Sequence, residues 1–368
     1  MSSPLVPPTR TLGRCGITVP AVGIGCWGIG GPDDNLGLPM GWSTGASAAD
    51  AIAGLEAAWQ LGARLFDTAD VYGHGRSERL LGRLVSQVPR EEIVLTSKVG
   101  YFAGTAEHAF HPRHMRHQLE QSLINLGTDH LDIYFLHRSD FGDDDRLLIP
   151  AVEAMHAFCS EGLIKAIGMR GPHRFARDRL TVAPNQRGDK IARFKEVFAV
   201  VQPQVLAVRD NLLSPLARSE GIFAFAAQHR TGVLINKPLG QGLLTGAYPS
   251  NMLRAFGPGD HRSRKRWFTD PAALALITEG LQELRALVGP RREDLIRIAL
   301  WACLDRYAHA AVLVGFTTPQ QVQQNLAALG EAPHSDVIAQ ARAIMARVQE
   351  KLDARGEVFT DEKAAAAQ

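Results

Sequence analysis

Strand-like and helix-like patterns alternate along this chain from about residue 20 to residue 330, and this alternation limits its fold more than any other feature. Each strand-like run is short and apolar, and a helical pattern follows it, as Ile52, Leu55 and Trp59 do after the first run. The eight strand-like runs are 20–25, 64–67, 93–98, 131–137, 163–169, 205–208, 232–235 and 311–314. Repeated α/β units of this kind predict a parallel sheet, and eight of them predict closure into a (β/α)8 TIM barrel.

Residues 1–330 are predicted to form one barrel domain, and residues 331–368 a C-terminal helical extension with an amphipathic pattern. Two long insertions interrupt the barrel, at 28–47 and at 239–270. Both follow strand ends, which is the face where a barrel carries its active site. We therefore expect each insertion to form either a wall of the pocket or a solvent-exposed loop.

Charge and composition exclude several classes of partner. The net charge of +2 is close to neutral, so neither a nucleic-acid nor a membrane partner is expected. No apolar stretch reaches the roughly 20 residues that span a bilayer, and the N-terminus lacks the pattern of a signal peptide. The four cysteines are widely spaced and form no CxxC pair, which predicts reduced thiols, no metal site and a cytoplasmic location. The oligomeric state does not follow from the sequence.

Four polar residues lie at or just beyond the ends of three neighbouring predicted strands: Asp67, Tyr72, Lys98 and His137. Because the carboxyl ends of parallel strands meet at one edge, these side chains are expected to share a pocket. A phenol, normally with a pKa of about 10, becomes a better acid beside a cation. Lys98 could supply that charge while Asp67 holds the ammonium, and His137 could polarise a carbonyl. Each residue alone has an ordinary structural explanation, and only their conjunction favours proton transfer to a carbonyl oxygen.

The segments around these residues resemble the aldo-keto reductase family. Residues 66–73 (FDTADVYG) look like the first signature of the family, 96–100 (TSKVG) like its lysine strand and 131–138 (LDIYFLHR) like its histidine strand. The resemblance implies an NAD(P)H-dependent enzyme in which hydride from a nicotinamide cofactor reduces an aldehyde, ketone or keto-sugar. It also implies that Tyr72 is the general acid within a tetrad formed with Asp67, Lys98 and His137.

The resemblance further implies where the cofactor binds, since 238–246 looks like the segment over the pyrophosphate and 315–325 like the adenosine-phosphate segment. The implied cofactor-binding residues are Arg170, Gly171, Pro238, Leu239, Gly240, Gly242, Gly315, Thr317, Thr318, Gln321, Gln324 and Asn325. Thr318 and Gln321 also form a capping-box pattern, and Pro319 suits the first position of a helix. A helix that begins there would point backbone N–H groups at a phosphate, or would simply be well capped.

Several positions depart from the family pattern on the nicotinamide side. Arg170-Gly171 replace the usual Ser-Asn pair, Ala207 replaces a glutamine and Asp210 replaces the aromatic residue that stacks on the ring. Thr317 stands where a basic residue usually pairs with the 2′-phosphate. Arg170 could restore a contact to the carboxamide, bind an anionic substrate or lie on the surface. We expect NADPH as the cofactor, with NADH as the alternative.

Other residues could form the remainder of the pocket. Trp27 and Trp42 are candidate substrate-binding walls, or else core residues. The basic stretch 261–267 could be a solvated face, or a flap that meets phosphates with Trp267 over the ligand. The departures also leave a second function open, namely a nicotinamide-binding regulatory or accessory subunit with little turnover. A barrel that has lost its cofactor is a third hypothesis.

Overall fold

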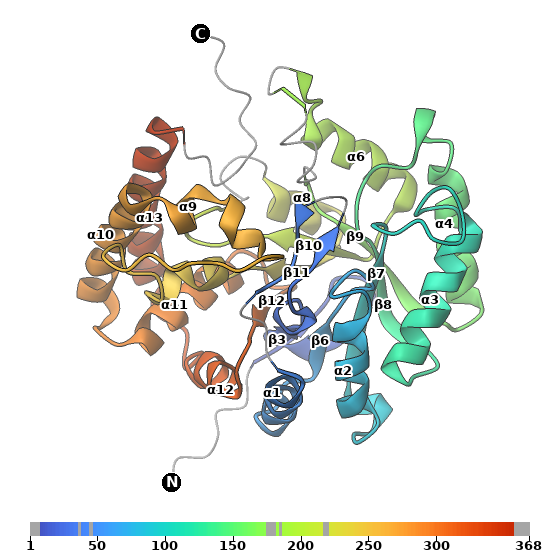
Figure 1. Ribbon diagram of the computed structural model, residues 1–368, viewed down its shortest axis with the longest axis horizontal. Helices are drawn as coiled ribbons and strands as arrows, with labels where there is room; N and C mark the ends of the chain where they lie inside the picture. Colours follow the sequence, from blue (N-terminus) through green and yellow to red (C-terminus); the bar gives the residue numbers. More distant parts are fainter. Residues whose placement is uncertain are drawn as a thin grey trace.

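A closed barrel of eight parallel strands forms the centre of the computed structural model, and helices surround it (Figure 1). The structure describes residues 8–35, 38–43, 47–173, 182–183, 186–215 and 221–356. In chain order the barrel strands are β3 (Val22–Gly25), β6 (Leu65–Asp67), β7 (Val94–Val99), β8 (Leu131–Leu136), β9 (Ile164–Arg170), β10 (Val205–Arg209), β11 (Gly232–Asn236) and β12 (Ala310–Gly315). Each strand pairs in parallel with its neighbours, and β12 pairs with β3 to complete the ring. The predicted (β/α)8 barrel is confirmed.

The helices lie between and after the strands, as the apolar spacing predicts. They are α1 (Ala48–Gln60), α2 (Arg76–Val85), α3 (Pro112–Leu126), α4 (Leu148–Ser160), α6 (Lys190–Val201), α8 (Ile222–Gln228), α9 (Arg266–Thr269), α10 (Pro271–Val288), α11 (Arg292–Leu304), α12 (Pro319–Ala327) and α13 (Ser335–Ala354). Gly127 ends α3 in the left-handed conformation, with φ of 66°, which glycine adopts at little cost. The apolar pattern also predicts a helix near 217–228, and residues 217–220 of it lie outside the described residues.

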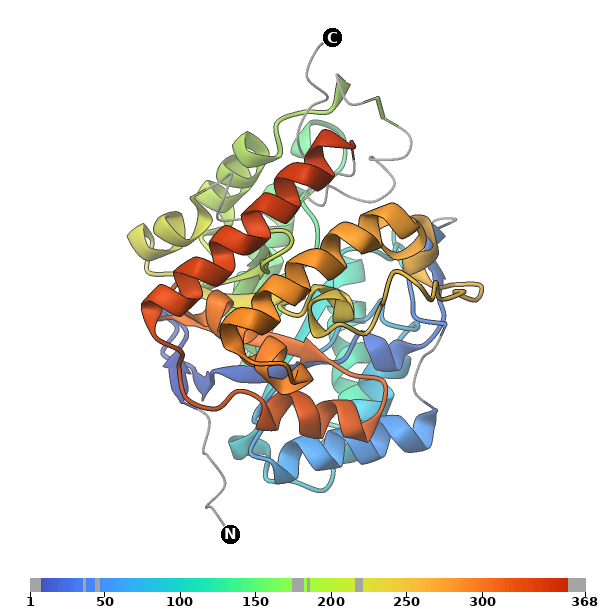
Figure 2. The same ribbon diagram turned by 90° about the vertical axis from the view of Figure 1, so that its left-hand side faces the viewer.

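Helix α10 is not among the elements that the sequence reading predicts. Its buried side chains recur at helical spacing, and Asp270 caps its first turn by accepting a hydrogen bond from the Ala272 N–H. The helix α13 lies along α10, and Figure 2 shows the two as long neighbouring helices coloured red and orange. The division into a barrel domain and a C-terminal extension stays a prediction, and residues 357–368 lie outside the described part of the chain.

A short N-terminal hairpin closes the barrel at the ends of the strands away from the predicted site. It consists of β1 (Thr9–Thr11) and β2 (Thr18–Pro20), which pair antiparallel. Leu12 and Val19 from this hairpin are buried with the barrel interior. This end of the barrel is therefore plugged, and only the opposite end is left to hold a ligand.

Alternation along the strands gives the barrel interior an apolar floor and a polar upper layer. Leu65, Phe135 and Leu234 point inward with the other interior residues and are buried together. Side chains two residues further along a strand point to the same side. Asp67 and Asn236 therefore face inward at the strand ends, above the apolar layer, and this layer forms the base of the site described below.

Candidate active site

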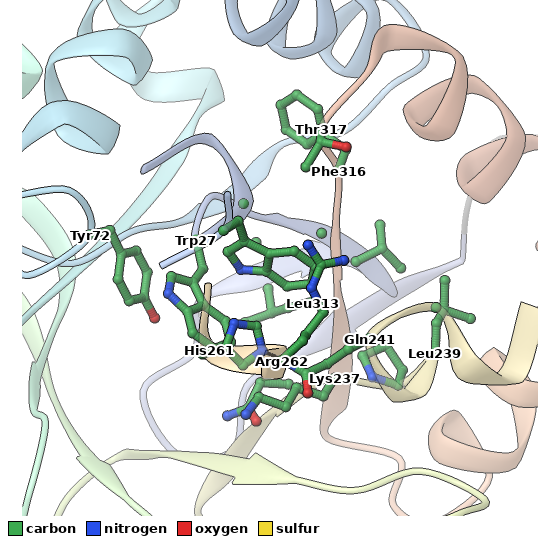
Figure 3. A pocket seen from close by; sticks show the side chains of 18 of the residues that line it. Trp27, Tyr72, Lys237, Leu239, Gln241, His261, Arg262, Leu313, Phe316 and Thr317 are labelled. Atoms are coloured by element: carbon green, nitrogen blue, oxygen red, sulfur yellow. Dashed lines mark hydrogen bonds between the residues drawn. The ribbon is translucent and has the colours of Figure 1, made fainter. Parts of the chain in front are cut away.

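A cavity of about 540 Å³ opens at the carboxyl ends of the barrel strands. All four residues of the predicted tetrad line it, as do both candidate substrate walls, Trp27 and Trp42. Figure 3 shows the hydroxyl of Tyr72 on one side of this cavity and Leu239 on the opposite side, with Trp27 and His261 between them. The structure thus brings together residues that the sequence separates by tens of positions.

Lys98 and Asp67 form a buried ion pair at the base of the cavity. The ammonium Nζ of Lys98 lies 2.7 Å from Oδ1 of Asp67 and also donates to the carbonyl oxygen of Thr68. The hydroxyl of Thr96 donates to the same carboxylate oxygen at 2.6 Å. Burial lowers the pKa of Lys98, and the adjacent Asp67 opposes that shift. The pair is held on two adjacent strands, β6 and β7, so its geometry is rigid.

Tyr72 lies beside this ion pair in the loop after β6. Nζ of Lys98 is 5.1 Å from the centre of the Tyr72 ring, and the ring of His137 is 6.1 Å away in an edge-on arrangement. The net pKa of the Tyr72 phenol is raised in these surroundings, and not lowered as expected. Burial raises the pKa of Tyr72 well above its ordinary value and Asp67 raises it further, whereas the guanidinium of Arg170 opposes the shift. Tyr72 is therefore a neutral phenol that retains its proton at physiological pH.

His137 directly follows β8 and is also buried in the wall of the cavity. The ring of Tyr101 packs edge-on against it with ring centres 4.7 Å apart. Burial lowers the pKa of His137 well below its ordinary value, and the cations of Arg170 and Lys98 add to this shift. The imidazole is consequently neutral, and a neutral imidazole can donate a hydrogen bond to a carbonyl oxygen without transferring its proton.

Two acidic residues are buried behind the tetrad. Glu78 accepts hydrogen bonds from Ser97 at 2.7 Å and from Asn125 at 2.9 Å, which satisfies its carboxylate. Asp70 is 4% exposed. Burial raises the pKa of Asp70 well above its ordinary value, and the like charge of Glu78 raises it further. Asp70 therefore tends to keep its proton in the folded protein.

We expect Asp70→Asn to stabilise the protein, and the gain should grow with pH. Because the folded pKa of Asp70 is raised, the unfolded chain releases this proton first, and wild-type stability falls as pH rises above about 4. The asparagine side chain does not titrate, so this variant does not lose stability in the same way as pH rises. Thermal unfolding of both proteins over a pH series measures the difference. Glu78→Gln, which replaces a carboxylate whose oxygens both accept hydrogen bonds, should lower the stability of the protein instead. If the difference in stability between Asp70→Asn and wild type did not change with pH, the interpretation would be contradicted.

Most of the residues predicted to bind cofactor line the cavity, but two do not. Gly171 and Gly240 are not among the lining residues. The N–H of Gly171 donates to the carbonyl of Ala207 at 2.9 Å and continues the strand pairing, and Gly240 lies close to Leu213 and Leu244 instead. Lining residues from the predicted set are Arg170, Pro238, Leu239, Gly242, Gly315, Thr317, Thr318, Gln321, Gln324 and Asn325.

Asp210 does not line the cavity, although the family pattern places it at the position of the aromatic residue that stacks on the ring. It follows the end of β10 and is 1% exposed. Its carboxylate Oδ2 lies 3.4 Å from Nε of Arg306 on the segment after α11. Ala207, which points inward with the barrel interior, does line the cavity. An acid therefore does not replace the aromatic residue within the cavity.

The start of α12 is capped, although the capping differs slightly from the predicted one. Oγ1 of Thr318 accepts a hydrogen bond from the N–H of Gln321 at 3.3 Å, as expected. The side chain of Gln321 accepts from the N–H of Thr317 at 2.8 Å rather than from that of Thr318. Thr318 is still the residue before the first helical residue, Pro319, and both Thr317 and Thr318 line the cavity.

Several lining residues were not predicted. Asn236 and Lys237 lie at the end of β11, where the rule that identified the tetrad would also have found them. Arg292 is the first residue of α11 and reaches the end of the cavity that α12 forms. Tyr101 follows β7 and contributes to the wall near the tetrad. For Tyr101 and Arg292 no sequence signal was available, because their positions depend on how separate segments pack.

The two insertions meet above the cavity and form its roof. His261 is fully buried, with its ring 4.4 Å from that of Trp27 and 4.8 Å from that of Trp42. The predicted solvated face is therefore wrong for this part of the basic stretch. Trp267 does not line the cavity but packs on the core, whereas Arg262, Arg264 and Lys265 do line it. The alternative, that this stretch is a flap that meets phosphates, stays a prediction.

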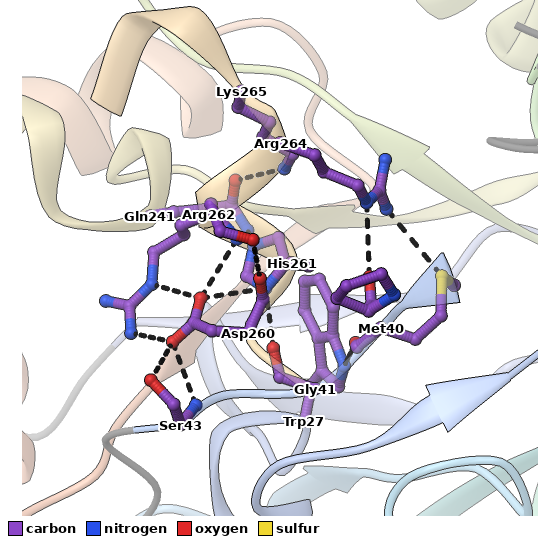
Figure 4. Close-up of polar contacts among 12 residues, drawn as sticks. Trp27, Met40, Gly41, Ser43, Gln241, Asp260, His261, Arg262, Arg264 and Lys265 are labelled. Atoms are coloured by element: carbon purple, nitrogen blue, oxygen red, sulfur yellow. Dashed lines mark hydrogen bonds and ion pairs between the residues drawn. The ribbon is translucent and has the colours of Figure 1, made fainter. Parts of the chain in front are cut away.

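Asp260 connects the two insertions that form this roof (Figure 4). Its buried carboxylate accepts from the N–H and hydroxyl of Ser43, both at 2.8 Å, and pairs with the guanidinium of Arg262 at 2.6 Å. His261 Nδ1 lies 2.8 Å from the carbonyl of Gly41, and Arg264 donates to the carbonyl of Pro39 at 3.1 Å. Both insertions are thus pocket walls, joined by polar contacts between segments more than 200 residues apart.

Asp260→Asn should loosen this roof, because breaking a buried ion pair costs about 3–5 kcal/mol. We expect faster tryptic cleavage within 239–270, which is rich in arginine, and weaker retention of the cofactor. Limited proteolysis followed by mass spectrometry measures the first effect. Asp129→Asn makes the same change at an exposed site and serves as the control. Equal cleavage rates in the wild type and Asp260→Asn would contradict the role of Asp260.

Comparison with known proteins agrees with this architecture. The family model "Aldo/keto reductase family" matches residues 21–346. An NADH-specific methylglyoxal reductase of Escherichia coli is 28% identical, covering 86% of this chain and 92% of that protein, and an L-galactose dehydrogenase of Arabidopsis thaliana is 28% identical, covering 88% of each. A putative voltage-gated potassium channel subunit beta of Schizosaccharomyces pombe is 26% identical, again covering 88% of each.

The fold is also similar to a solved glycerol dehydrogenase from Gluconobacter oxydans, with a TM-score of 0.70, 23% identity and coverage of 94% of this chain and 96% of that one. Within the described residues, no helix has the length and apolar character to cross a membrane. The family model covers most of the chain, and the chain folds as a closed barrel of eight parallel strands. This protein belongs to the aldo/keto reductase family and is an enzyme that uses a nicotinamide cofactor.

Proposed function

We propose that this enzyme reduces the carbonyl of a small aldehyde, ketone or keto-sugar with NADPH, and that Tyr72 is the general acid. The observation that carries the proposal is the shared wall of the cavity, where Tyr72, His137 and the Lys98–Asp67 pair lie together. Relatives named for methylglyoxal and L-galactose support a small, oxygen-rich substrate.

Each residue of the tetrad has a role that its surroundings support. The bound nicotinamide supplies hydride to the carbonyl carbon. Tyr72, a neutral phenol, donates its proton to the carbonyl oxygen as negative charge develops there, because an alkoxide is far more basic than a phenolate. Neutral His137 donates a hydrogen bond that orients the carbonyl. Lys98, fixed by Asp67, stabilises the phenolate that remains after proton transfer.

The residues of the cavity fit a dinucleotide that carries phosphates. Eight of the lining residues carry a positive charge, and only Asp33 and Asp67 carry a negative one. Oδ1 of Asn236 is buried and has no hydrogen-bond donor among the described residues, so it could accept from the carboxamide of a nicotinamide. Arg292 lines the cavity with Thr317, and its neighbour Glu293 accepts a hydrogen bond from Gln324 of α12, so Arg292 could take the place of the missing basic residue and favour NADPH over NADH.

Two measurements test the proposal. Because Trp27 and Trp42 line the cavity, tryptophan fluorescence should report cofactor binding. Titration with NADPH and with NADH should show saturable binding, tighter for NADPH. Oxidation of NADPH in the presence of a panel of small aldehydes, ketones and keto-sugars should show turnover. Binding without turnover over the whole panel would favour the accessory-subunit alternative, and tighter binding of NADH would overturn the cofactor preference.

A further inference from the structure

Arg170 lies beside the tetrad, on the side of the cavity where the substrate would react. It is the last residue of β9 and lies four residues after Ala166, which points into the barrel, so the side chain of Arg170 points to the same side. Its Nη1 donates to the hydroxyl of Tyr101 at 3.4 Å, and the Tyr101 ring packs against His137. The guanidinium therefore extends from β9 across the end of β8 to the segment after β7, and it lies in the half of the cavity mouth that holds His137.

The positive charge of Arg170 has no counter-ion among the described side chains of the cavity. Among the residues that the structure describes, no carboxylate forms an ion pair with it. Both carboxylates in the wall already have partners, since Asp67 binds Lys98 and Asp33 lies 2.8 Å from His74. The same positive charge opposes protonation of His137 and of Lys98. Arg170 is partly buried, and a guanidinium in such a position is suited to bind an anion.

The neighbouring strand leaves room beside this guanidinium. Ala207 is the register partner of Arg170 on β10, and both residues line the cavity. The methyl side chain of Ala207 fills little of the space between the two strand ends. A small charged group could therefore approach Arg170 from the β10 side while a carbonyl lies against Tyr72 and His137.

We propose that Arg170 binds an anionic group, a carboxylate or a phosphate, on the carbonyl substrate, and so makes the enzyme selective for charged over uncharged aldehydes and ketones. This inference rests on the reductase function proposed above. The guanidinium suits either anion, because its fork of N–H groups matches two oxygens at once. The hydrogen bond to Tyr101 orients Arg170 toward the tetrad, and Asn236 is the better placed partner for a carboxamide.

Two pairs of substrates separate the effect of charge from that of the carbonyl. Glyoxylate is compared with methyl glyoxylate, and glycolaldehyde phosphate with glycolaldehyde, and the two pairs distinguish a carboxylate from a phosphate. The wild type should prefer the anionic member of at least one pair. Arg170→Met should lower kcat/KM for that member, mainly through KM, by about 10- to 100-fold more than for the neutral member of the same pair. Arg170→Lys should retain part of the preference, because it keeps the charge without the fork.

Arg116→Met is the matched control, because Arg116 pairs with Glu161 on the outer helices. Equal losses for both members of each pair, in kcat rather than KM, would mean that Arg170 acts on the reacting carbonyl, and a large loss of NADPH affinity would assign it to the cofactor. Either result overturns the proposal. Equal wild-type rates for charged and neutral members would overturn it too, while the reductase function would stand.

A binding measurement covers the case in which the wild type reduces no carbonyl and the reductase function itself fails. Glyoxylate and glycolaldehyde phosphate are each titrated by calorimetry against protein saturated with NADP+. Saturable binding that Arg170→Met abolishes and Arg116→Met preserves would support the anion site. Absence of binding of both anions, or equal binding to wild type and Arg170→Met, would overturn it.

Discussion

Tyr72→Phe should abolish carbonyl reduction, with kcat lower by about 10²–10⁴-fold, while NADPH affinity stays nearly unchanged. The substitution removes one hydroxyl and leaves the ring that packs between Lys98 and His137. Without that hydroxyl the tetrad has no phenol to donate a proton to the carbonyl oxygen, and neither His137, whose pKa is lowered, nor Lys98, which Asp67 holds, is an equivalent donor. Steady-state oxidation of NADPH measures turnover, and fluorescence titration measures affinity.

Tyr134→Phe is the matched control for this experiment. Tyr134 is fully buried in the wall of the barrel, does not line the cavity and has no hydrogen-bond partner for its hydroxyl among the described residues. Loss of its hydroxyl should therefore leave turnover close to that of the wild type. Retained turnover in Tyr72→Phe would remove Tyr72 from the role of general acid. Equal losses in both variants would point to a general effect of losing a buried hydroxyl.

Lys98→Met should reduce both stability and activity. Removal of the ammonium leaves Asp67 as a buried carboxylate with Thr96 as its remaining side-chain donor, and breaking a buried ion pair in this way costs about 3–5 kcal/mol. Activity should fall by about 10²-fold or more, because the cation beside the Tyr72 ring is lost. Chemical denaturation and steady-state kinetics measure the two effects separately.

A double variant separates the structural role of Lys98 from its catalytic one. In Lys98→Met with Asp67→Asn, the asparagine can still accept the hydrogen bond of Thr96 and no longer carries a charge. Most of the lost stability should therefore return, whereas turnover should remain low. Recovery of turnover together with stability would mean that Lys98 serves only the fold. Wild-type stability in the single variant would contradict the buried pair itself.

Short-range patterns in the sequence were enough to predict the barrel and its tetrad. Strand and helix periodicities are local, and a polar residue at the end of an apolar run marks the edge of a parallel sheet. Asp67, Lys98 and His137 follow this rule, and all three line the observed cavity. The same rule, applied to β11, would have identified Asn236.

Only the tertiary structure shows which distant segments contact one another around this edge of the barrel. The contact of Asp260 with Ser43 joins residues 217 positions apart, and neither segment carries a periodic signal for it. Asp210 does not line the cavity, and it lies three residues after the inward-pointing Ala207, which is the opposite alternation along the strand. The orientation of Arg170 depends on Tyr101, a residue from another strand end. Periodicity records which face of its own strand or helix a residue occupies, whereas contacts between loops depend on how the closed barrel brings their ends together.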